Sequence, residues 1–382
     1  MNLADMLCYA DIQDLGRIAR HYACECSLHS KNELIQTILA TVNRRDVLEQ
    51  TVGALAEEDR QFLNSLLFDP KDAYSLEELL AKAGNALLSA PGSQQTEDIA
   101  DTNPRDLIAR FKQRGWLFHG FSNQSKMVYR VPQDLKRRVA DVLFNQYHGR
   151  LQHLSELPYG YRDEQGLLSH DMLVFLRMLA EGEMPLNLEG FLYKKHLLKV
   201  LQSLSVQEEP VGKTAWRFGY GRRFKLYPLR FSFLYDYVYS HGYIEEQPGW
   251  LKLTPQGAAR LADGTEEPAD AFYHFWLKLY QQAVPNLKMV AYWAIRLTEE
   301  WVTAESLGQV LIGLIKPFYY DSPQSIYTEK VVPMLLHLGL IRIGLDDGQR
   351  QAVQRTSLGQ VALDNGPKAS GRKAAKSTAA KD

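Results

Sequence analysis

The feature that most constrains this chain is a glycine at the end of an apolar helical pattern, which occurs three times. Each glycine precedes two apolar residues, and a Thr or Pro that can open a new helix follows the glycine after 12 or 17 positions. The copies are Arg114-Gly115-Trp116-Leu117 with Pro132, His241-Gly242-Tyr243-Ile244 with Thr254, and Leu338-Gly339-Leu340-Ile341 with Thr356. Glycine ends a helix in a left-handed conformation at little steric cost. Repetition of this kind predicts an array of similar modules.

The residues after each glycine show two short apolar runs separated by a turn, which is typical of β-hairpins. The predicted strands are Trp116–Gly120 with Met127–Val131, Tyr243–Glu245 with Trp250–Leu253, and Leu340–Ile343 with Ala352–Arg355. Three helices followed by a hairpin form a winged helix, so we predict a mainly helical fold with small β-hairpins (α+β) and tandem winged-helix domains. The predicted domains are winged helices at 50–148, 165–263 and 270–363, after a small helical unit at 1–48 and before a disordered basic tail at 364–382.

Composition narrows the class of protein. The chain has 382 residues, a formal net charge of −1 and three cysteines. A chain with so little net charge needs a local patch of cations if it binds nucleic acid. Three cysteines do not make a disulfide framework, no apolar run approaches the roughly 20 residues that span a bilayer, and no secretory signal is evident. We therefore expect a cytoplasmic, nucleoid-associated protein that does not contact a membrane.

The first 48 residues contain a helix start that carries a further expectation. Ser30-Lys31-Asn32-Glu33 is a capping box, and the apolar helical face of Leu34, Ile35, Ile38 and Leu39 follows it. This helix–loop–helix resembles the SAP-like unit in the N-terminal domain of the Rho transcription terminator. The resemblance implies contact with nucleic acid through the cations Arg17, Arg20, Lys31, Arg44 and Arg45. The alternative is that these cations belong to a solvated helical face.

The strongest local charge lies between Lys194 and Arg230. Its cations are Lys194, Lys195, Lys199, Lys213, Arg217, Arg222, Arg223, Lys225 and Arg230, against Glu208 and Glu209. The aromatic residues among them are Trp216, Phe218, Tyr220, Phe224 and Tyr227. Cations attract phosphates and exposed aromatic rings stack on unpaired bases, so the segment predicts a nucleic-acid interface. The alternative is a strand whose aromatic residues pack in the core while its arginines face water.

The helix before each glycine occupies the position of a recognition helix, which needs polar and cationic residues on its exposed face to read a major groove. The first of these helices fits best, through Arg105, Arg110, Lys112, Gln113 and Arg114. The second offers the mixed set Arg230, Ser232, Asp236, Tyr239 and His241. The third offers only Glu329, Lys330 and His337. A helix so poor in cations is better suited to docking a protein.

Three further patterns do not lead to catalytic or metal chemistry. Gly212-Lys213-Thr214 lacks the first glycine of a phosphate-binding loop, because position 207 is Gln, and Glu208 and Glu209 would repel phosphates. Cys8, Cys24, Cys26 and His29 equal zinc ligands in number, but their spacing favours buried or half-buried thiols. His170-Asp171 is interpreted as helix capping. We therefore expect no enzyme activity, no cofactor and no metal.

A second resemblance rests on the segments around Gly242 and Gly339. Phe231-x-x-Leu234, His241-Gly242-Tyr243-Ile244 and Leu253-Thr254-Pro255-x-Gly257 resemble the winged-helix region that precedes the motor in bacterial XPB-type DNA helicases. The resemblance implies helicase-associated handling of DNA, although no motor sequence is readable in this chain. We therefore predict a non-enzymatic DNA-binding accessory or regulatory factor associated with a helicase or with transcription or repair. The alternative is a docking scaffold whose winged helices bind a helicase or polymerase partner.

Overall fold

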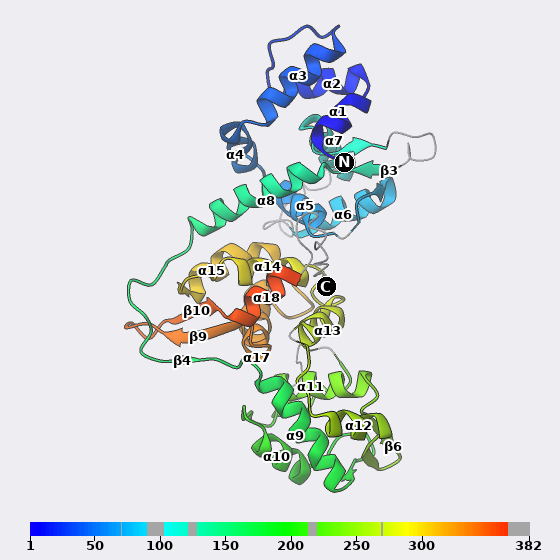
Figure 1. Cartoon of the computed structure of the whole chain (residues 1–382), viewed down its shortest axis with the longest axis vertical. Helices are drawn as coiled ribbons and strands as arrows, with labels where there is room; N and C mark the ends of the chain where they lie inside the picture. The colour runs from blue at the N-terminus through cyan, green and yellow to red at the C-terminus, as the bar shows by residue number, and fades with distance from the viewer. Residues whose placement is uncertain are drawn as a thin grey trace, which may run out of the picture. The chain divides into compact units, whose positions relative to one another are not determined.

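The structure is a computed structural model that describes residues 1–69, 71–89, 103–120, 128–212, 219, 221–268 and 270–365. The described chain is mainly helical with small antiparallel sheets, as predicted (Figure 1). It divides into two compact units, Met1–Arg150 and Leu151–Asn365. Of the predicted tail, residues 364 and 365 end a helix, and residues 366–382 lie outside the described part of the chain. The finer domain boundaries drawn from the sequence remain predictions.

The first unit begins with four helices and continues with helices around a small sheet. The opening helices are α1 (Leu3–Tyr9), α2 (Ile12–His21), α3 (Lys31–Val42) and α4 (Arg45–Gly53). The elements that follow are α5 (Glu57–Leu67), β1 (Tyr74–Ser75), α6 (Leu76–Ser89), α7 (Pro104–Gln113), β2 (Phe118–His119), β3 (Val128–Arg130) and α8 (Gln133–His148). The strand order is β1-β3-β2, with both pairs antiparallel.

The predicted cap at Ser30 is present in part. The Ser30 hydroxyl accepts a hydrogen bond from the N–H of Glu33 at 3.3 Å and so begins α3. The Glu33 carboxylate does not return a bond to Ser30; it accepts one from the N–H of Ser27 at 3.1 Å. The serine therefore caps the helix, while the glutamate ties down the preceding loop.

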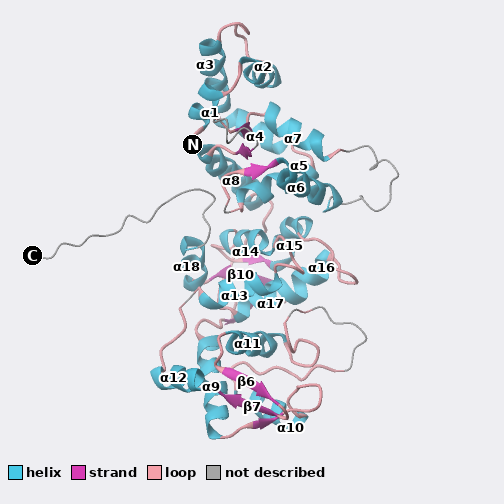
Figure 2. Cartoon of the chain, turned by 90° about the vertical axis from the view of Figure 1, so that its right-hand side faces the viewer, coloured by secondary structure: helices cyan, strands magenta, loops and turns pink. Residues whose placement is uncertain are grey.

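The second unit holds two sets of helices, each with its own sheet (Figure 2). The first set is α9 (Leu167–Glu181), β5 (Met184–Pro185), α10 (Lys194–Ser203), α11 (Leu229–Ser240), β6 (Ile244–Gln247), β7 (Trp250–Leu253) and α12 (Pro255–Asp263). The helix α13 (Ala271–Tyr280) follows. The second set is α14 (Leu287–Arg296), β8 (Val302–Thr303), α15 (Ala304–Leu311), the short helical segments η2 (Ile312–Leu314), α16 (Pro323–Ile326) and η3 (Tyr327–Val331), α17 (Val332–His337), β9 (Ile341–Leu345), β10 (Gln351–Arg355) and α18 (Ser357–Asn365).

One order of elements recurs three times, at 57–148, 167–263 and 287–365, which we name repeats 1, 2 and 3. In each repeat a short strand follows the first helix, two strands follow the third helix, and a further helix closes the repeat. The last strand lies between the other two, in the orders β1-β3-β2, β5-β7-β6 and β8-β10-β9. Repeat 3 differs in two respects: the short segments η2, α16 and η3 separate α15 from α17, and β4 (Tyr161–Arg162) adds a fourth strand beside β9.

The three glycines end their helices in the predicted left-handed conformation. Gly115, Gly242 and Gly339 have φ values of 66°, 67° and 69°. In each case the N–H of the next residue donates back five positions, with N···O distances of 3.0, 3.0 and 2.9 Å. This six-residue closure turns the chain sharply from the third helix into the hairpin. The same local geometry therefore positions all three hairpins.

A threonine closes the hairpin in repeats 2 and 3. The hydroxyl of Thr254 donates to the carbonyl oxygen of Gly242 at 2.6 Å and accepts from the N–H of Gly257 at 3.0 Å. Thr356 makes the same pair of bonds, at 2.5 and 3.0 Å, in repeat 3. The closing helix is thereby held against the glycine junction, and a Cβ at Gly257 would collide with the carbonyl oxygen of Tyr243.

Gly257→Ala is therefore expected to destabilise the second unit by about 1–3 kcal/mol, because the added methyl group meets rigid backbone. Gly182→Ala is the matched control in the same repeat, since a Cβ there meets nothing within 4 Å and the backbone is extended. Unfolding in urea, followed by circular dichroism, measures both variants. Equal stability of the two would contradict the close packing at Gly257.

Candidate nucleic-acid interface

The structure separates the predicted nucleic-acid residues of repeat 2 into three groups. The exposed residues are Lys194, Lys195, Lys199, Arg222 and Lys225. The Arg223 side chain is only 13% exposed, and Arg230 is completely buried. Arg217 lies outside the described residues, together with Lys213, Trp216, Phe218 and Tyr220. The exposed lysines and Arg222 therefore remain available to a ligand in water.

A short loop brings the start of α10 next to the turn between β6 and β7. Residues 187–191 make a tight turn, after which Leu192 pairs with Leu186 as an antiparallel bridge. The N–H of Leu186 donates to the carbonyl oxygen of Gly249, within the β6–β7 turn, at 2.8 Å. Because α10 begins two residues after Leu192, its first-turn lysines lie close to that turn.

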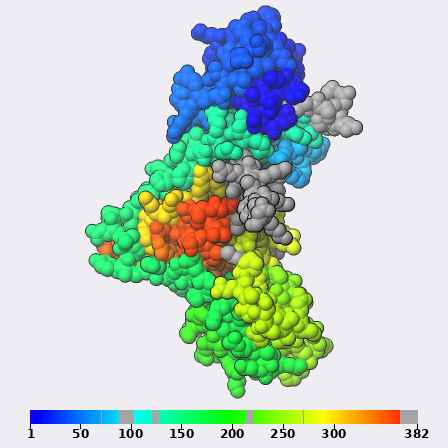
Figure 3. Space-filling view, in the orientation of Figure 1, coloured from blue at the N-terminus to red at the C-terminus, as the bar shows by residue number. Residues whose placement is uncertain are grey.

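A second loop, residues 221–227, packs against the first. The N–H of Leu192 donates to the hydroxyl of Tyr227 at 2.8 Å. The guanidinium of Arg223 donates to the carbonyl oxygen of Glu189 at 3.0 Å. The two loops, the start of α10 and the β6–β7 turn therefore meet. Figure 3 shows the green part of the chain that contains α10 at the molecular surface.

We name the exposed side chains of these segments the basic–aromatic face. Its members are Leu188, Tyr193, Lys194, Lys195, Arg222, Lys225, Leu226 and Trp250. Tyr193 and Trp250 are 53% and 45% exposed. The sequence did not indicate either ring, because both lie outside the charged segment between Lys194 and Arg230. The available signals were a tyrosine directly before two lysines and a tryptophan directly after a Pro-Gly turn.

Acidic groups beneath the face hold its arginines in place. The Glu246 carboxylate accepts hydrogen bonds from Arg222 at 2.8 Å, from Arg223 at 2.6 Å and from the Tyr235 hydroxyl at 2.7 Å. Burial alone would raise the pKa of Glu246, but these bonds hold that pKa below its ordinary value. Burial raises the pKa of Asp236 to about 6, and its carboxylate accepts from the N–H of Arg222 at 2.9 Å. The lysines therefore supply most of the uncompensated charge.

Of the aromatic residues predicted for stacking, the structure describes Phe224 and Tyr227, and neither is exposed. Tyr227 is completely buried, with its ring 5.1 Å from that of Phe231 and 5.4 Å from that of Tyr235. Phe224 is half-buried. Tyr227 therefore packs in the core, as the alternative interpretation expected, but it lies in a loop and not in a strand.

Arg230, predicted to contact nucleic acid, lies instead at the centre of a buried ionic cluster. Its guanidinium donates to Asp171 of α9 at 2.6 Å and lies 3.5 Å from the Glu164 carboxylate. Glu164 in turn lies 2.9 Å from Nδ1 of His337 in α17. Burial alone would raise the pKa of Glu164, but the His337 hydrogen bond and the nearby arginines hold that pKa below its ordinary value.

Asp171 was expected to cap a helix, but it does not, because the cap of α9 is Gly166. Asp171 lies inside α9, where its second oxygen accepts from the N–H of Ser205 at 2.7 Å. The cluster thus joins α9 and α11 of repeat 2 to α17 of repeat 3, and it leaves Arg230 out of reach of a phosphate.

The third helices of repeats 2 and 3 do not present a recognition surface. Residues 230–238 of α11 are all buried. In α17 every residue except Pro333 is buried. A helix that reads a major groove must expose one face to the base edges. These two helices are core elements of the second unit in this structure, so they are not available to a groove.

The cations of the first unit are largely engaged. Arg105 is exposed, but Arg110 and Arg114 both bind the buried Asp59, at 2.7 and 2.8 Å. Lys112 lies 3.0 Å from Nε2 of His119. In the N-terminal helices, ion pairs join Arg17 to Asp14, Arg44 to Asp46 and Arg45 to Glu49. The first unit therefore offers less uncompensated charge than the predicted cation set suggests.

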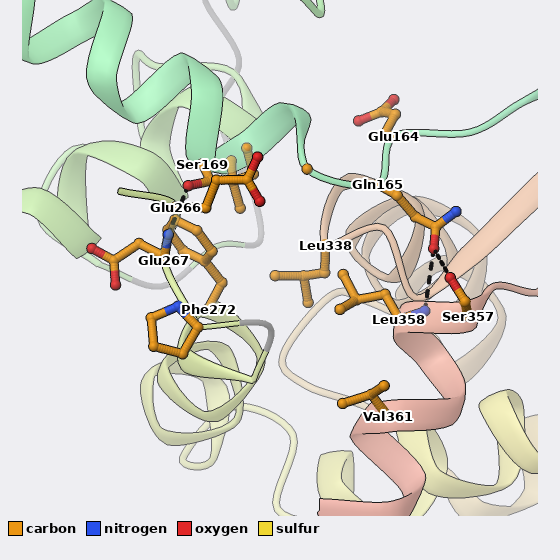
Figure 4. A pocket seen from close by; sticks show the side chains of 13 residues that line it. Glu164, Gln165, Ser169, Glu266, Glu267, Phe272, Leu338, Ser357, Leu358 and Val361 are labelled. Atoms are coloured by element: carbon orange, nitrogen blue, oxygen red, sulfur yellow. Dashed lines mark hydrogen bonds between the residues drawn. The ribbon is translucent and has the colours of Figure 1, made fainter. Parts of the chain in front are cut away.

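A pocket of about 320 Å³ lies between the start of α9 and α18 (Figure 4). Leu168, Phe272 and Leu338 line it with apolar surface. At one wall the Gln165 side-chain oxygen accepts from the Ser357 hydroxyl at 2.8 Å and from the N–H of Leu358 at 3.2 Å. These bonds join the turn before α9 to the start of α18, so the pocket belongs to the seam between those segments.

The described residues contain no group of three or more His, Cys, Asp or Glu side chains placed to hold a metal ion. Cys24 and Cys26 are half-buried thiols, whereas Cys8 is exposed, contrary to expectation. Among the described helices, none has the length and apolar character required to cross a membrane.

Comparison of the chain with protein-family models, with curated proteins and with solved structures found no match.

Arg230→Met is expected to destabilise the second unit by about 3–5 kcal/mol, because it leaves Asp171 buried and charged without its partner. Arg230→Met combined with Asp171→Asn should recover part of that loss, since no unpaired charge remains at position 171. Lys199→Ala, on an exposed position, should change stability by less than about 0.5 kcal/mol. Urea unfolding measures all three, and an Arg230→Met variant as stable as Lys199→Ala would contradict the role of the cluster.

Proposed function

We propose that this chain is a non-enzymatic DNA-binding accessory factor that contacts phosphates and bases through the basic–aromatic face. The observation that carries the proposal is that the segments carrying the exposed Lys194, Lys195 and Lys225 meet the segments carrying the exposed rings of Tyr193 and Trp250. Exposed ammonium groups bind phosphates and release counterions from the nucleic acid. Exposed rings supply stacking surfaces for bases.

The order of elements supports winged-helix domains as the modules of this factor. In all three repeats the strand after the first helix pairs with the last strand of the hairpin that follows the third helix. We propose that the repeats are tandem winged helices. The resemblance to the region preceding the motor in XPB-type helicases then suggests a helicase, or a transcription or repair protein, as the partner.

The burial of α11 and α17 determines which segments are assigned to DNA contact. Because neither helix exposes a face for base reading, DNA contact is assigned to the start of α10 and the two loops beside it. Lys199 extends the surface, since it lies four residues after Lys195 and so on the same side of α10.

Lys194→Ala/Lys195→Ala is expected to weaken DNA binding and its dependence on salt. If both ammonium groups contact phosphates, the slope of log affinity against log salt concentration should fall by about 1.4 on a single strand. Fluorescence anisotropy of a labelled oligonucleotide over a salt series measures this slope. Folding should be kept, because both side chains are exposed in the first turn of α10.

The matched control removes the same charge elsewhere in the second unit. Arg177→Ala/Lys278→Ala changes two exposed cations, on α9 and α13, that lie outside the basic–aromatic face. Its salt slope should equal that of the unmodified chain. If both double variants bind DNA alike, the assignment of the face fails.

A second candidate function, protein docking, is favoured by exposed apolar residues beside β9. Leu157, Tyr159 and Tyr161 are 79%, 93% and 55% exposed. They lie on the segment that contributes β4, and Tyr161 pairs with Gly344 of β9. A partner that co-purifies with the chain and is lost in Tyr159→Ser would support docking by repeat 3.

A further inference from the structure

We infer that the basic–aromatic face binds single strands of nucleic acid in preference to duplexes. This inference rests on the proposed function and specifies its ligand class: a polyanionic strand whose bases are unpaired. Three observations lead to it: which elements are buried, which charges the hairpin carries, and how the exposed rings are placed.

The described residues of repeat 2 offer neither an exposed recognition helix nor an uncharged hairpin that could enter a groove. Groove reading needs a helix or a β-ribbon that enters the groove, and residues 230–238 of α11 are buried. The hairpin is an unsuitable replacement, because β6 carries Glu245 and Glu246 side by side and Glu245 is exposed. A carboxylate at this position repels the phosphates that flank a groove. The end of the hairpin, by contrast, carries Trp250.

The two rings of the face are placed for stacking. Tyr193 directly precedes α10 and Trp250 begins β7, and the bridge of Leu186 to Leu192, together with the hydrogen bond of Leu186 to Gly249, joins these two segments. Within the described residues, neither ring stacks on or packs edge-on against another aromatic ring. An exposed ring outside the core offers its face to a base, and each stacked base is worth roughly 1–3 kcal/mol.

The lysines of the face lie on the segment that carries Tyr193 or on the loop packed against it, so they can bind the phosphates of a single strand whose bases stack on the exposed rings. Lys194 and Lys195 directly follow Tyr193, and Lys225 lies on the loop that packs against residues 189–192. A single strand presents phosphates on one side and unpaired bases on the other, so it can satisfy rings and lysines together. In a duplex the bases are stacked inside and only the phosphates remain for the lysines.

The experiment measures affinities of the full chain for labelled oligo(dT), for oligo(rU) and for a mixed-sequence DNA duplex of equal length, by anisotropy at one salt concentration. We expect the single strands to bind at least about tenfold more tightly than the duplex, which corresponds to one stacked base. Equal affinities, or tighter duplex binding, would overturn this inference while leaving the proposed function standing. Failure to bind any of the three would overturn both.

Ring variants test the stacking itself. Trp250→Ala and Tyr193→Ala should each lower oligo(dT) affinity about fivefold or more and leave duplex affinity unchanged. Tyr193→Phe should retain binding, since it keeps the ring. Tyr159→Ala is the matched control, because it removes a 93% exposed ring outside the face. Equal losses in Tyr159→Ala and Trp250→Ala would overturn the inference.

Tryptophan emission supplies a readout that misfolding would not imitate. Among the described tryptophans, Trp116, Trp276, Trp293 and Trp301 are buried, whereas Trp250 is exposed. In a Trp216→Phe background, which removes the tryptophan outside the described residues, saturating oligo(dT) should quench the emission. The quenching should disappear when Trp250→Phe is added. Unchanged emission on saturation would contradict stacking on Trp250.

Discussion

The second unit depends on one buried guanidinium. Arg230 is completely enclosed, and removal of its charge from water is offset only because Asp171 and Glu164 lie beside it. The three groups come from α11, from α9 and from the turn before α9, and His337 extends the cluster to α17. This arrangement fixes α11 in the interior and joins repeat 2 to repeat 3. Because α11 is buried, the candidate interface is formed by the start of α10 and the loops beside it.

The surface that repeat 2 offers to a ligand is formed by the start of α10, the β6–β7 turn and the two loops beside them. The same glycine junction and the same threonine cap set the hairpin in repeats 2 and 3. One difference lies at the β9 edge, which β4 covers in repeat 3. In repeat 2 the loops at 187–191 and 221–227 are held together instead, and they display lysines and rings. One local fold thus supports two different surfaces.

The sequence predicted the elements well wherever a single residue dictates the backbone. Glycine is the residue that best tolerates the left-handed turn, so Gly115, Gly242 and Gly339 marked the helix ends and the hairpins correctly. Charge counting was less informative, because it cannot separate a cation in water from one paired inside. Arg230 and Lys194 look alike in the sequence, yet Arg230 is buried with carboxylates that are distant along the chain, and Lys194 is exposed. Trp250 was not predicted because it lies outside the charged segment, and because the sequence does not distinguish an exposed tryptophan in a strand from a core residue.

Hydrogen–deuterium exchange of the whole chain with and without saturating oligo(dT) tests the central claim most directly, because it locates the bound strand without any substitution. Ligand binding at the basic–aromatic face predicts slower exchange in peptides covering 188–195, 221–226 and 247–250, with the buried residues of α11 unchanged. Slower exchange confined to α7, or an exchange pattern that oligo(dT) leaves unaltered across repeat 2, would contradict it.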